Sequence, residues 1–362
     1  MVSIQKASFL LEQHGRLEVG TRQVPLSPGP GQALVKVTAA AINPVDWKLK
    51  DHYGFLLKEY PAILGSDGAG IVETIGPEVS DLKKGDRVFF QGRYNPDFAT
   101  FQQYTLVDSK LLAKTSDSVT DDEASTIPVA IIAAGFALFQ KSSVQFPLNE
   151  PTGSGKSVLI IGGSSSVGQY GKLIVANPLQ ALMDVLLLSA IQLARIAGFS
   201  PIVTTASAKH AEHLRGLGAT HIVDRSADVK TIQAAFKEPV ALVVDTISQP
   251  DTQSTALGVL HTPTTIPGAH LAVVTPLQEH LKAKNEALGS SSVSINEVQG
   301  ISHSNREIAE PFWRAIGSWL ESGKLVPNRV QVVPGGLEAV AEALKLSKEG
   351  VSGVKLVIHP QD

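Results

Sequence analysis

The chain has 362 residues, of which 43% are hydrophobic and 18% charged, proportions typical of a soluble globular protein with a well-developed core. Its 31 Lys and Arg residues are balanced by 34 Asp and Glu residues, so there is no basic excess with which to bind nucleic acid. Cysteine is absent, which excludes disulfides, thiolate zinc sites, iron–sulfur centres and a cysteine nucleophile.

The amino-terminal residues lack the charged start, apolar core and small-residue cleavage site of a secretory signal. The most apolar stretch, residues 179–199, contains Asp184 and Arg195, which makes it a poor membrane span. We therefore expect a cytoplasmic protein without a membrane segment. At roughly 100–200 residues per domain, its length predicts two domains.

The first 125 residues have the pattern of a β-rich domain. Runs of β-branched residues occur at 31–38, 70–75 and 86–90, and Gly and Pro punctuate the segments between them. Many short strands at this spacing are typical of a small barrel or sandwich. The period then changes, because residues 121–139 open with acidic residues and continue apolar at helical spacing. This segment predicts one helix that bridges two domains.

From residue 157 onward, buried strands alternate with helices, a rhythm that predicts a parallel, doubly wound α/β sheet. The last part of the chain holds a further helix, a strand, a second helix and a closing strand. The predicted strands are 158–161, 201–205, 221–223, 241–244, 270–274, 330–333 and 354–358, and the predicted helices are 191–197, 208–217, 229–236, 310–322 and 337–346.

A glycine-rich loop follows the first strand of this series directly, and it is a dinucleotide fingerprint in which serine replaces the middle glycine. The glycines permit a tight strand-to-helix turn, and the helix start then offers unpaired N–H groups to a pyrophosphate. The alternative is a purely structural turn. The predicted cofactor-binding residues of this loop are Gly163, Ser164, Ser165, Ser166, Val167 and Gly168.

The end of the next predicted strand indicates which cofactor is bound. An enzyme that uses NAD usually carries an acidic residue there, which binds the adenine ribose hydroxyls. Here no acidic residue occurs before Glu212, whereas Ser207 and Lys209 follow this strand and Arg225 follows the next. These three side chains can bind a ribose 2′-phosphate, so the predicted cofactor is NADPH. The alternative for Lys209 is a solvated lysine at a helix start.

Residues 171–189 form an anomalous insertion. Gly168 lies 37 residues before Thr205, the end of the next predicted strand, where the fingerprint leads one to expect about 20. The surplus falls inside the predicted helix after the glycine loop, and Pro178 should break that helix. One hypothesis is an intron translated in frame, since the first codons can contain a GTAAG donor and the last a CAG acceptor. The alternative is a genuine surface insertion.

With the glycine loop placed, further motifs resemble a known family. The matching stretches are residues 40–48, 61–72, 85–89, 217–224 and 353–358. Together they resemble the zinc-free branch of medium-chain dehydrogenases/reductases, and they are especially similar to quinone oxidoreductases and fungal trans-acting enoyl reductases. The resemblance implies an α/β protein with a GroES-like β-rich catalytic domain and a Rossmann nucleotide-binding domain. The implied boundaries are 1–125 for the catalytic domain, 126–309 for the Rossmann domain and 310–362 for a return to the catalytic domain.

The resemblance also locates the metal positions of zinc-dependent members. In those members a catalytic Cys falls near Asn43, and a Gly-His-Glu motif falls at Gly65, Ser66 and Asp67. Neither motif is present here, and the four-cysteine structural zinc lobe is missing too, so we expect no metal site. Ala133 stands where many relatives place Thr near the nicotinamide, so no hydroxyl contact is expected from this position.

Without zinc, ordinary alcohol dehydrogenation loses the Lewis acid that polarises the alcohol oxygen. Hydride from NADPH can still be delivered to a carbon that is already electrophilic, in an enone, an enoyl thioester or a quinone. The resemblance places Asn43, Asp46, Lys48 and Tyr53 at the wall of the cleft. Asn43 would hold the nicotinamide ribose or the substrate, Lys48 would bind the ribose or stabilise negative charge, and Asp46 would orient Lys48. The alternative is that these are turn residues.

The predicted function is NADPH-dependent reduction of an activated C=C bond or a quinone without zinc. One alternative is a zinc-free alcohol or carbonyl dehydrogenase. Another is a non-catalytic nucleotide-binding or partner-docking protein, impaired by residues 171–189. A trans-acting enoyl reductase would also need a carrier protein or synthase as partner. We expect a monomer or homodimer, with the strand near residues 271–275 as the candidate dimer edge.

Overall fold

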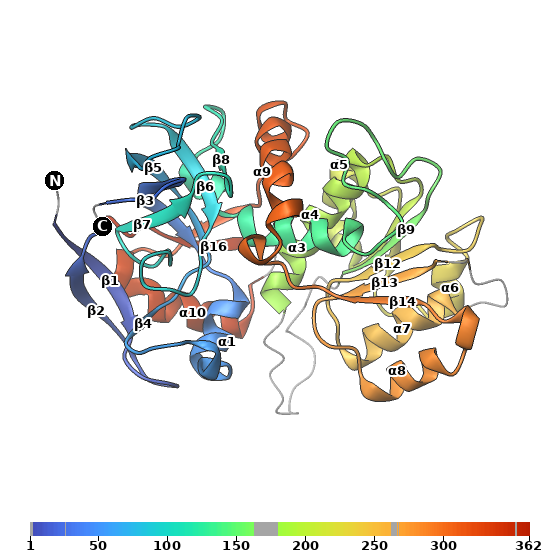
Figure 1. Ribbon diagram of the computed structural model, residues 1–362. Coiled ribbons are helices and arrows are strands. Elements are labelled where there is room, and N and C mark those ends of the chain that lie inside the picture. The colour runs from blue at the N-terminus through green and yellow to red at the C-terminus, as the bar shows by residue number, and fades with distance from the viewer. Residues whose placement is uncertain (1–2, 26, 163–179, 262–265, 267, 352) are drawn as a thin grey trace. The chain divides into compact units, whose positions relative to one another are not determined.

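The computed structural model describes residues 3–25, 27–162, 180–261, 266, 268–351 and 353–362, and its fold is α/β as predicted (Figure 1). The chain divides into two compact units. The first consists mainly of Met1–Val129 and Ser302–Asp362, and the second consists mainly of residues 130–162 and Met183–Ile301. Among the described residues, every helix is too short or too polar to cross a membrane.

The first unit is built on β-strands that pair mainly antiparallel. Within the described residues, a seven-stranded sheet has the order β15-β16-β3-β5-β6-β8, with β7 also paired to β3, and a second sheet has the order β2-β1-β4. Its strands are β1 (Ile4–Leu10), β2 (Leu17–Gln23), β3 (Gln32–Ala41), β4 (Ala62–Ile63), β5 (Asp67–Ile75), β6 (Arg87–Gln91), β7 (Tyr104–Asp108), β8 (Leu112–Lys114), β15 (Val330–Val332) and β16 (Lys355–Ile358).

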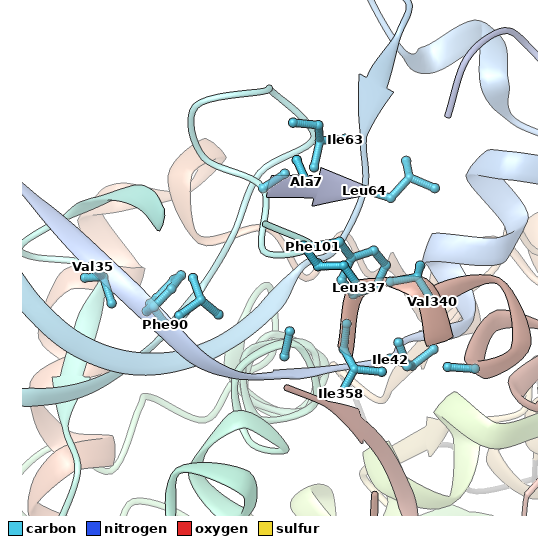
Figure 2. Packing of buried hydrophobic residues seen from close by; sticks show 14 of the residues in the cluster. Ala7, Val35, Ile42, Ile63, Leu64, Phe90, Phe101, Leu337, Val340 and Ile358 are labelled. Carbon is cyan, nitrogen blue, oxygen red and sulfur yellow. The ribbon is translucent and has the colours of Figure 1, made fainter. Parts of the chain in front are cut away.

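The two ends of the chain share one core in this unit. Ala7 and Ile358 belong to the same buried cluster as Phe90 and Phe101 (Figure 2). The unit is therefore closed only when the last strand has joined the first residues. Its helices are α1 (Pro44–Asp51), η1 (Gly54–Leu56), α2 (Asp121–Ser125), η4 (Ser302–Ser304), α9 (Arg306–Glu321), η5 (Gly336–Ala339) and α10 (Val340–Glu349).

The single helix expected over residues 121–139 is two helices, α2 and α3 (Pro128–Phe139). Thr120 begins α2 with a capping box, in which its hydroxyl accepts from the N–H of Glu123 and the Glu123 carboxylate accepts from the N–H of Thr120. Pro128 has no N–H to continue that helix, but its fixed φ suits the first position of a new one. The proline therefore ends α2 and begins α3.

The second unit contains the predicted parallel sheet. The strand order is β11-β10-β9-β12-β13-β14, and each of these neighbouring strands pairs parallel with the next. The chain fills one side from β9 outward and then the other, which is the doubly wound arrangement that binds nucleotides at the carboxyl edge. The elements are β9 (Val158–Ile161), α4 (Gln180–Ile196), β10 (Ile202–Ala206), η2 (Ala208–His210), α5 (Ala211–Leu217), β11 (His221–Asp224), α6 (Val229–Gln233), β12 (Leu242–Asp245), α7 (Pro250–Leu260), β13 (His270–Val273), α8 (Glu279–Glu286), η3 (Gly289–Ser291) and β14 (Ser294–Glu297).

The candidate dimer edge near residues 271–275 is a wrong prediction. Figure 1 shows β12, β13 and β14 side by side, and β13 pairs with β12 on one side and β14 on the other. Strand β14 was not predicted, because Ile295 is the one apolar residue among its four and the strand is half exposed. The described edge of the sheet on this side is therefore β14.

Candidate active site

Three neighbouring strands bring polar side chains to one end of the larger sheet in the first unit. Ala41, the last residue of β3, pairs with Val357 of β16 and with Asp67 of β5, both antiparallel. Asn43 therefore leaves β3 at the end of the sheet where Asp67 begins β5 and Lys355 begins β16. Asn43 and Asp67 are fully buried, and Lys355 is 3% exposed.

The ammonium of Lys355 forms a buried ion pair with Asp67 Oδ2. It also donates to Asn43 Oδ1 at 3.0 Å and to the carbonyl oxygen of Thr126 at 3.4 Å, so its three N–H donors have three acceptors. The other oxygen of Asp67 accepts from the backbone N–H of Val129 at 2.8 Å, in the first turn of α3. Because an unpaired charge is costly to bury, this network requires both members of the ion pair.

The start of α1 is tied into the same cluster. The backbone N–H of Asn43 donates to Asp46 Oδ2 at 2.8 Å, and Pro44, which has no N–H, takes the first helical position. Asn43 Nδ2 donates to Ser66 Oγ at 3.2 Å. Asp46 Oδ1 accepts from the Ser66 hydroxyl at 3.4 Å and from the Tyr94 hydroxyl at 3.3 Å. Two of the predicted catalytic residues, Asn43 and Asp46, are thus brought together.

This environment changes the acidity of two groups. Burial raises the pKa of Asp46 to about 7, and the N–H of Asn43 and the ammonium of Lys355 offset only part of that effect. The Asp46 carboxyl is therefore partly protonated at neutral pH and can donate a hydrogen bond as well as accept one. Burial also raises the pKa of Tyr94 well above its usual value, so its hydroxyl keeps its proton.

Glycine is required immediately before these residues. Gly65 has a φ of +100°, and a Cβ there would lie 2.4 Å from Thr100 Oγ1 and 2.8 Å from the backbone nitrogen of Phe101. Any other residue would combine a strained backbone with a clash. The chain can therefore deliver Ser66 and Asp67 into the cluster only through glycine.

Lys48 and Tyr53, the other two predicted catalytic residues, lie outside the buried cluster. Burial lowers the pKa of Lys48 to about 8, and its Nζ lies 5.9 Å from the centre of the Trp47 ring. Among the described residues, Asp46 makes no hydrogen bond or ion pair with Lys48, so the expected direct orientation of Lys48 is not observed. The reason is helical geometry, since residues two apart do not face each other. Tyr53 is 45% exposed, and its ring contacts that of His52 edge-on.

In the second unit, the carboxyl edge of the sheet carries the predicted cofactor residues that the structure describes. Ser207 and Lys209 follow β10, and Arg225 follows β11. Because Ala206 pairs with Asp224, Ser207 and Arg225 leave neighbouring strands at the same level. Lys209 and Arg225 are exposed, and Ser207 is half-buried. The loop residues Gly163, Ser164, Ser165, Ser166, Val167 and Gly168 lie outside the described residues.

Sequence reasoning missed two buried ionisable residues, Asp245 and Lys355. Asp245, the last residue of β12, is fully buried, and its Oδ1 accepts from the N–H groups of Ile247 and Ser248 at 3.0 and 2.8 Å. Burial raises the pKa of Asp245 to about 7. Lys355 was missed as well. The available signal was a charged residue at the end of an otherwise apolar strand, a position that must be paired or neutralised.

The described part of residues 171–189 is helical. Helix α4 begins at Gln180, well before the predicted start at residue 191. Leu187 is 3% exposed, and a Cβ added at Gly162 would lie 2.3 Å from its methyl carbon. The end of the insertion therefore packs into the core of the second unit beside β9. Residues 171–179 lie outside the described residues.

Comparison with known proteins gives the family. Residues 29–117 match the alcohol dehydrogenase GroES-like domain, and residues 188–309 match the zinc-binding dehydrogenase domain. The trans-enoyl reductase himH of Aspergillus japonicus is 34% identical over 337 residues, which cover 91% of this chain and 89% of himH. The chain belongs to the medium-chain dehydrogenase/reductase superfamily.

Two further proteins are similar to the chain, one in sequence and one in fold. The enoyl reductase component lovC of the lovastatin nonaketide synthase, from Aspergillus terreus, is 25% identical over 384 residues, covering 98% of this chain and 96% of lovC. An alcohol dehydrogenase superfamily protein from Novosphingobium aromaticivorans has the same fold, with a TM-score of 0.77, 24% identity and coverage of 98% and 99% of the two chains. The chain is thus an oxidoreductase of a superfamily whose members use nicotinamide cofactors.

Proposed function

We propose that this chain transfers hydride from NADPH to the β-carbon of an enone or enoyl thioester, or to a quinone, and that it does so without zinc. The observation that carries the proposal is the buried ion pair of Lys355 with Asp67, beside Asn43. This cluster includes the positions that the family resemblance assigns to zinc ligands.

The residues at those positions do not fit zinc. A zinc site of this superfamily is built from thiolate, imidazole and carboxylate ligands, whereas Asn43 offers an amide and Ser66 a hydroxyl. The one carboxylate among them, Asp67, has both oxygens engaged by Lys355 and Val129. A metal ion would also have to approach a buried ammonium of like charge. We therefore derive no step of the reaction through a metal.

The described residues at the sheet edge of the second unit fit NADPH better than NADH. The phosphate on the ribose of NADPH needs cationic or hydroxyl donors, and Ser207, Lys209 and Arg225 provide them from adjacent strand ends. The acidic residue that would bind the free ribose hydroxyls of NADH is absent from the end of β10. When bound, NADPH supplies the hydride.

Lys48 is the group best suited to the charge that develops on the acceptor. With a pKa of about 8, it is mostly protonated at pH 7 and loses its proton readily. An ammonium beside the carbonyl oxygen of an enone stabilises the enolate formed when hydride reaches the β-carbon, and a proton from solvent then completes the α-carbon. Tyr53 is exposed enough to contact the acceptor. Asn43 and Asp46 are buried, so we assign them the positioning of α1.

The relative lovC is the enoyl reductase component of a synthase, which supports an enoyl thioester on a carrier protein or synthase as the acceptor class for this chain. A second candidate function is nucleotide binding without turnover. It is favoured by residues 171–189, because this segment follows directly on the predicted pyrophosphate loop.

The test is NADPH oxidation with a panel of acceptors: an enone, an enoyl thioester, a quinone and a simple ketone. The full chain is compared with a variant that lacks residues 171–189, each with and without EDTA. We expect turnover of the first three acceptors, unchanged by EDTA. Tight NADPH binding by both proteins without oxidation on any acceptor would instead support the non-catalytic candidate.

A further inference from the structure

The ammonium of Lys355 contacts the residue that begins α1 directly and is linked to the first turn of α3 through Asp67. Lys355 donates a hydrogen bond to Asn43, the residue that caps α1, and forms an ion pair with Asp67. Asp67 in turn accepts a hydrogen bond from the N–H of Val129, in the first turn of α3. Lys355 also bonds the carbonyl oxygen of Thr126, at the end of α2. The three segments are far apart in sequence and meet at this nitrogen.

The ammonium determines how the Asn43 side chain is turned. Only the oxygen end of an amide can face a cation, so Asn43 Oδ1 points to Lys355 and Nδ2 is left to donate to Ser66. The Asn43 backbone N–H donates to Asp46. The Oδ1, Nδ2 and backbone N–H of Asn43 are therefore all held by hydrogen bonds, which fixes the direction in which α1 leaves the sheet.

We propose that Lys355 is a positioning residue for the reaction: its buried ammonium serves as a built-in cation that orients Asn43 and Asp67, and so sets the start of α1, which carries Lys48. The proposal deepens the proposed function and rests on it for the role of Lys48. The placement of α1 by Lys355 can also be tested without any turnover.

The ammonium holds these oxygen atoms together as a bound cation would. Three acceptors from β5, the β3–α1 junction and the end of α2 converge on it. Unlike a metal ion, it is covalently attached to the first residue of β16, which pairs with β3. The site therefore needs no exchangeable cation, and its geometry is complete only after the last strand has joined the sheet.

The informative variant is Lys355→Met/Asp67→Asn. Lys355→Met alone leaves Asp67 buried without a partner and can fail to fold. The double variant removes both charges, and an asparagine at position 67 still offers Oδ1 to the N–H of Val129. The matched control is Lys345→Met on α10, because Lys345 is an exposed lysine that forms a surface ion pair with Glu342.

Two measurements are made on the double variant, the control and the unmodified chain. The first is hydrogen exchange of the amides in residues 44–51. Loss of a hydrogen bond to a charged group raises the equilibrium constant for local opening by about 10- to 100-fold. We therefore expect the exchange rate to increase by about that factor in the double variant only. The second is steady-state kinetics, where we expect kcat for the enone to fall by a similar factor. The KM for NADPH should stay within about twofold, since Ser207, Lys209 and Arg225 belong to the other unit.

A folded double variant with unchanged exchange over residues 44–51 overturns the proposal, whether or not the chain is a reductase. Faster exchange with unchanged kcat in an active chain overturns the link to the reaction. If the unmodified chain reduces no acceptor, the proposed function fails, while the exchange experiment still decides whether Lys355 places α1.

Discussion

Asp46 should make the stability of the first unit fall as the pH rises, and Asp46→Asn should remove that effect. The pKa of Asp46 is about 7 in the folded chain against an ordinary value of 3.8, because burial disfavours the charged form. Between these two values the folded state binds the proton and the unfolded state does not. The free energy of unfolding therefore falls from about pH 4 to about pH 7 and is level above that range.

The size of this effect follows from the two pKa values. Each pH unit between them changes the free energy of unfolding by about 1.4 kcal/mol, so Asp46 should contribute a loss of about 2–3 kcal/mol between pH 5 and pH 8. Asparagine has the same shape and no charge, and its Oδ1 can still accept the N–H of Asn43. The free energy of unfolding of the variant, minus that of the unmodified chain, should therefore be larger at pH 8 than at pH 5.

Urea unfolding followed by tryptophan fluorescence measures this difference. The three tryptophans of the chain, Trp47, Trp313 and Trp319, all lie in the first unit, so the signal reports on the unit that contains Asp46. The surface variant Asp81→Asn serves as the control and should keep the pH dependence of the unmodified chain. If the change in free energy of unfolding between pH 5 and pH 8 is the same in Asp46→Asn as in the unmodified chain, within about 0.5 kcal/mol, then Asp46 is ionised in the folded state and the reasoning from burial is wrong.

Three further predictions concern the proposed reaction and the packing of the second unit. The rate with an enone should fall as the pH rises through about 8, where Lys48 loses its charge. Lys48→Met should lower kcat/KM about 100-fold and abolish this decrease in the pH profile. A loss of less than about twofold would show that Lys48 takes no part in the mechanism. Lys209→Met and Arg225→Met should each raise the Kd for NADPH by about 10-fold or more in fluorescence titrations and leave the Kd for NADH unchanged. Equal effects on both cofactors would show that these side chains do not bind the 2′-phosphate. Gly162→Ala places a methyl group 2.3 Å from a Leu187 carbon and should lower the free energy of unfolding by about 1–3 kcal/mol, whereas an unchanged urea midpoint would show that Leu187 does not pack there.

The sheet of the second unit could be predicted because its central strands are buried on both faces. Such strands are continuous apolar runs, and residues 158–161 were predicted with the bounds that β9 has. Strand β14 lacks this signal, since it lies at an edge and is half exposed. The helix over residues 121–139 was predicted as one because its apolar period continues through Pro128, whose effect on the backbone is local.

The site could be predicted only where its chemistry is local in sequence. Asn43 and Asp46 are three residues apart and belong to one turn, so a motif contains both. Lys355 is separated from Asn43 by 312 positions and reaches it only because β16 pairs with β3. The sequence of β16 by itself contains nothing that specifies this partner. For Asp46 and Lys48 the situation is reversed. Their proximity in sequence suggested a contact, and helical geometry prevents it.

Transfer of a labelled hydride tests the central claim most directly. The full chain, treated with EDTA, is given an enone and NADPH that carries deuterium at the transferable position of the nicotinamide, and the product is examined by NMR. We predict one deuterium at the β-carbon of a saturated ketone, at the same rate with and without EDTA. Deuterium at the carbonyl carbon, or turnover that disappears with EDTA and returns with zinc, would contradict metal-free reduction of the C=C bond.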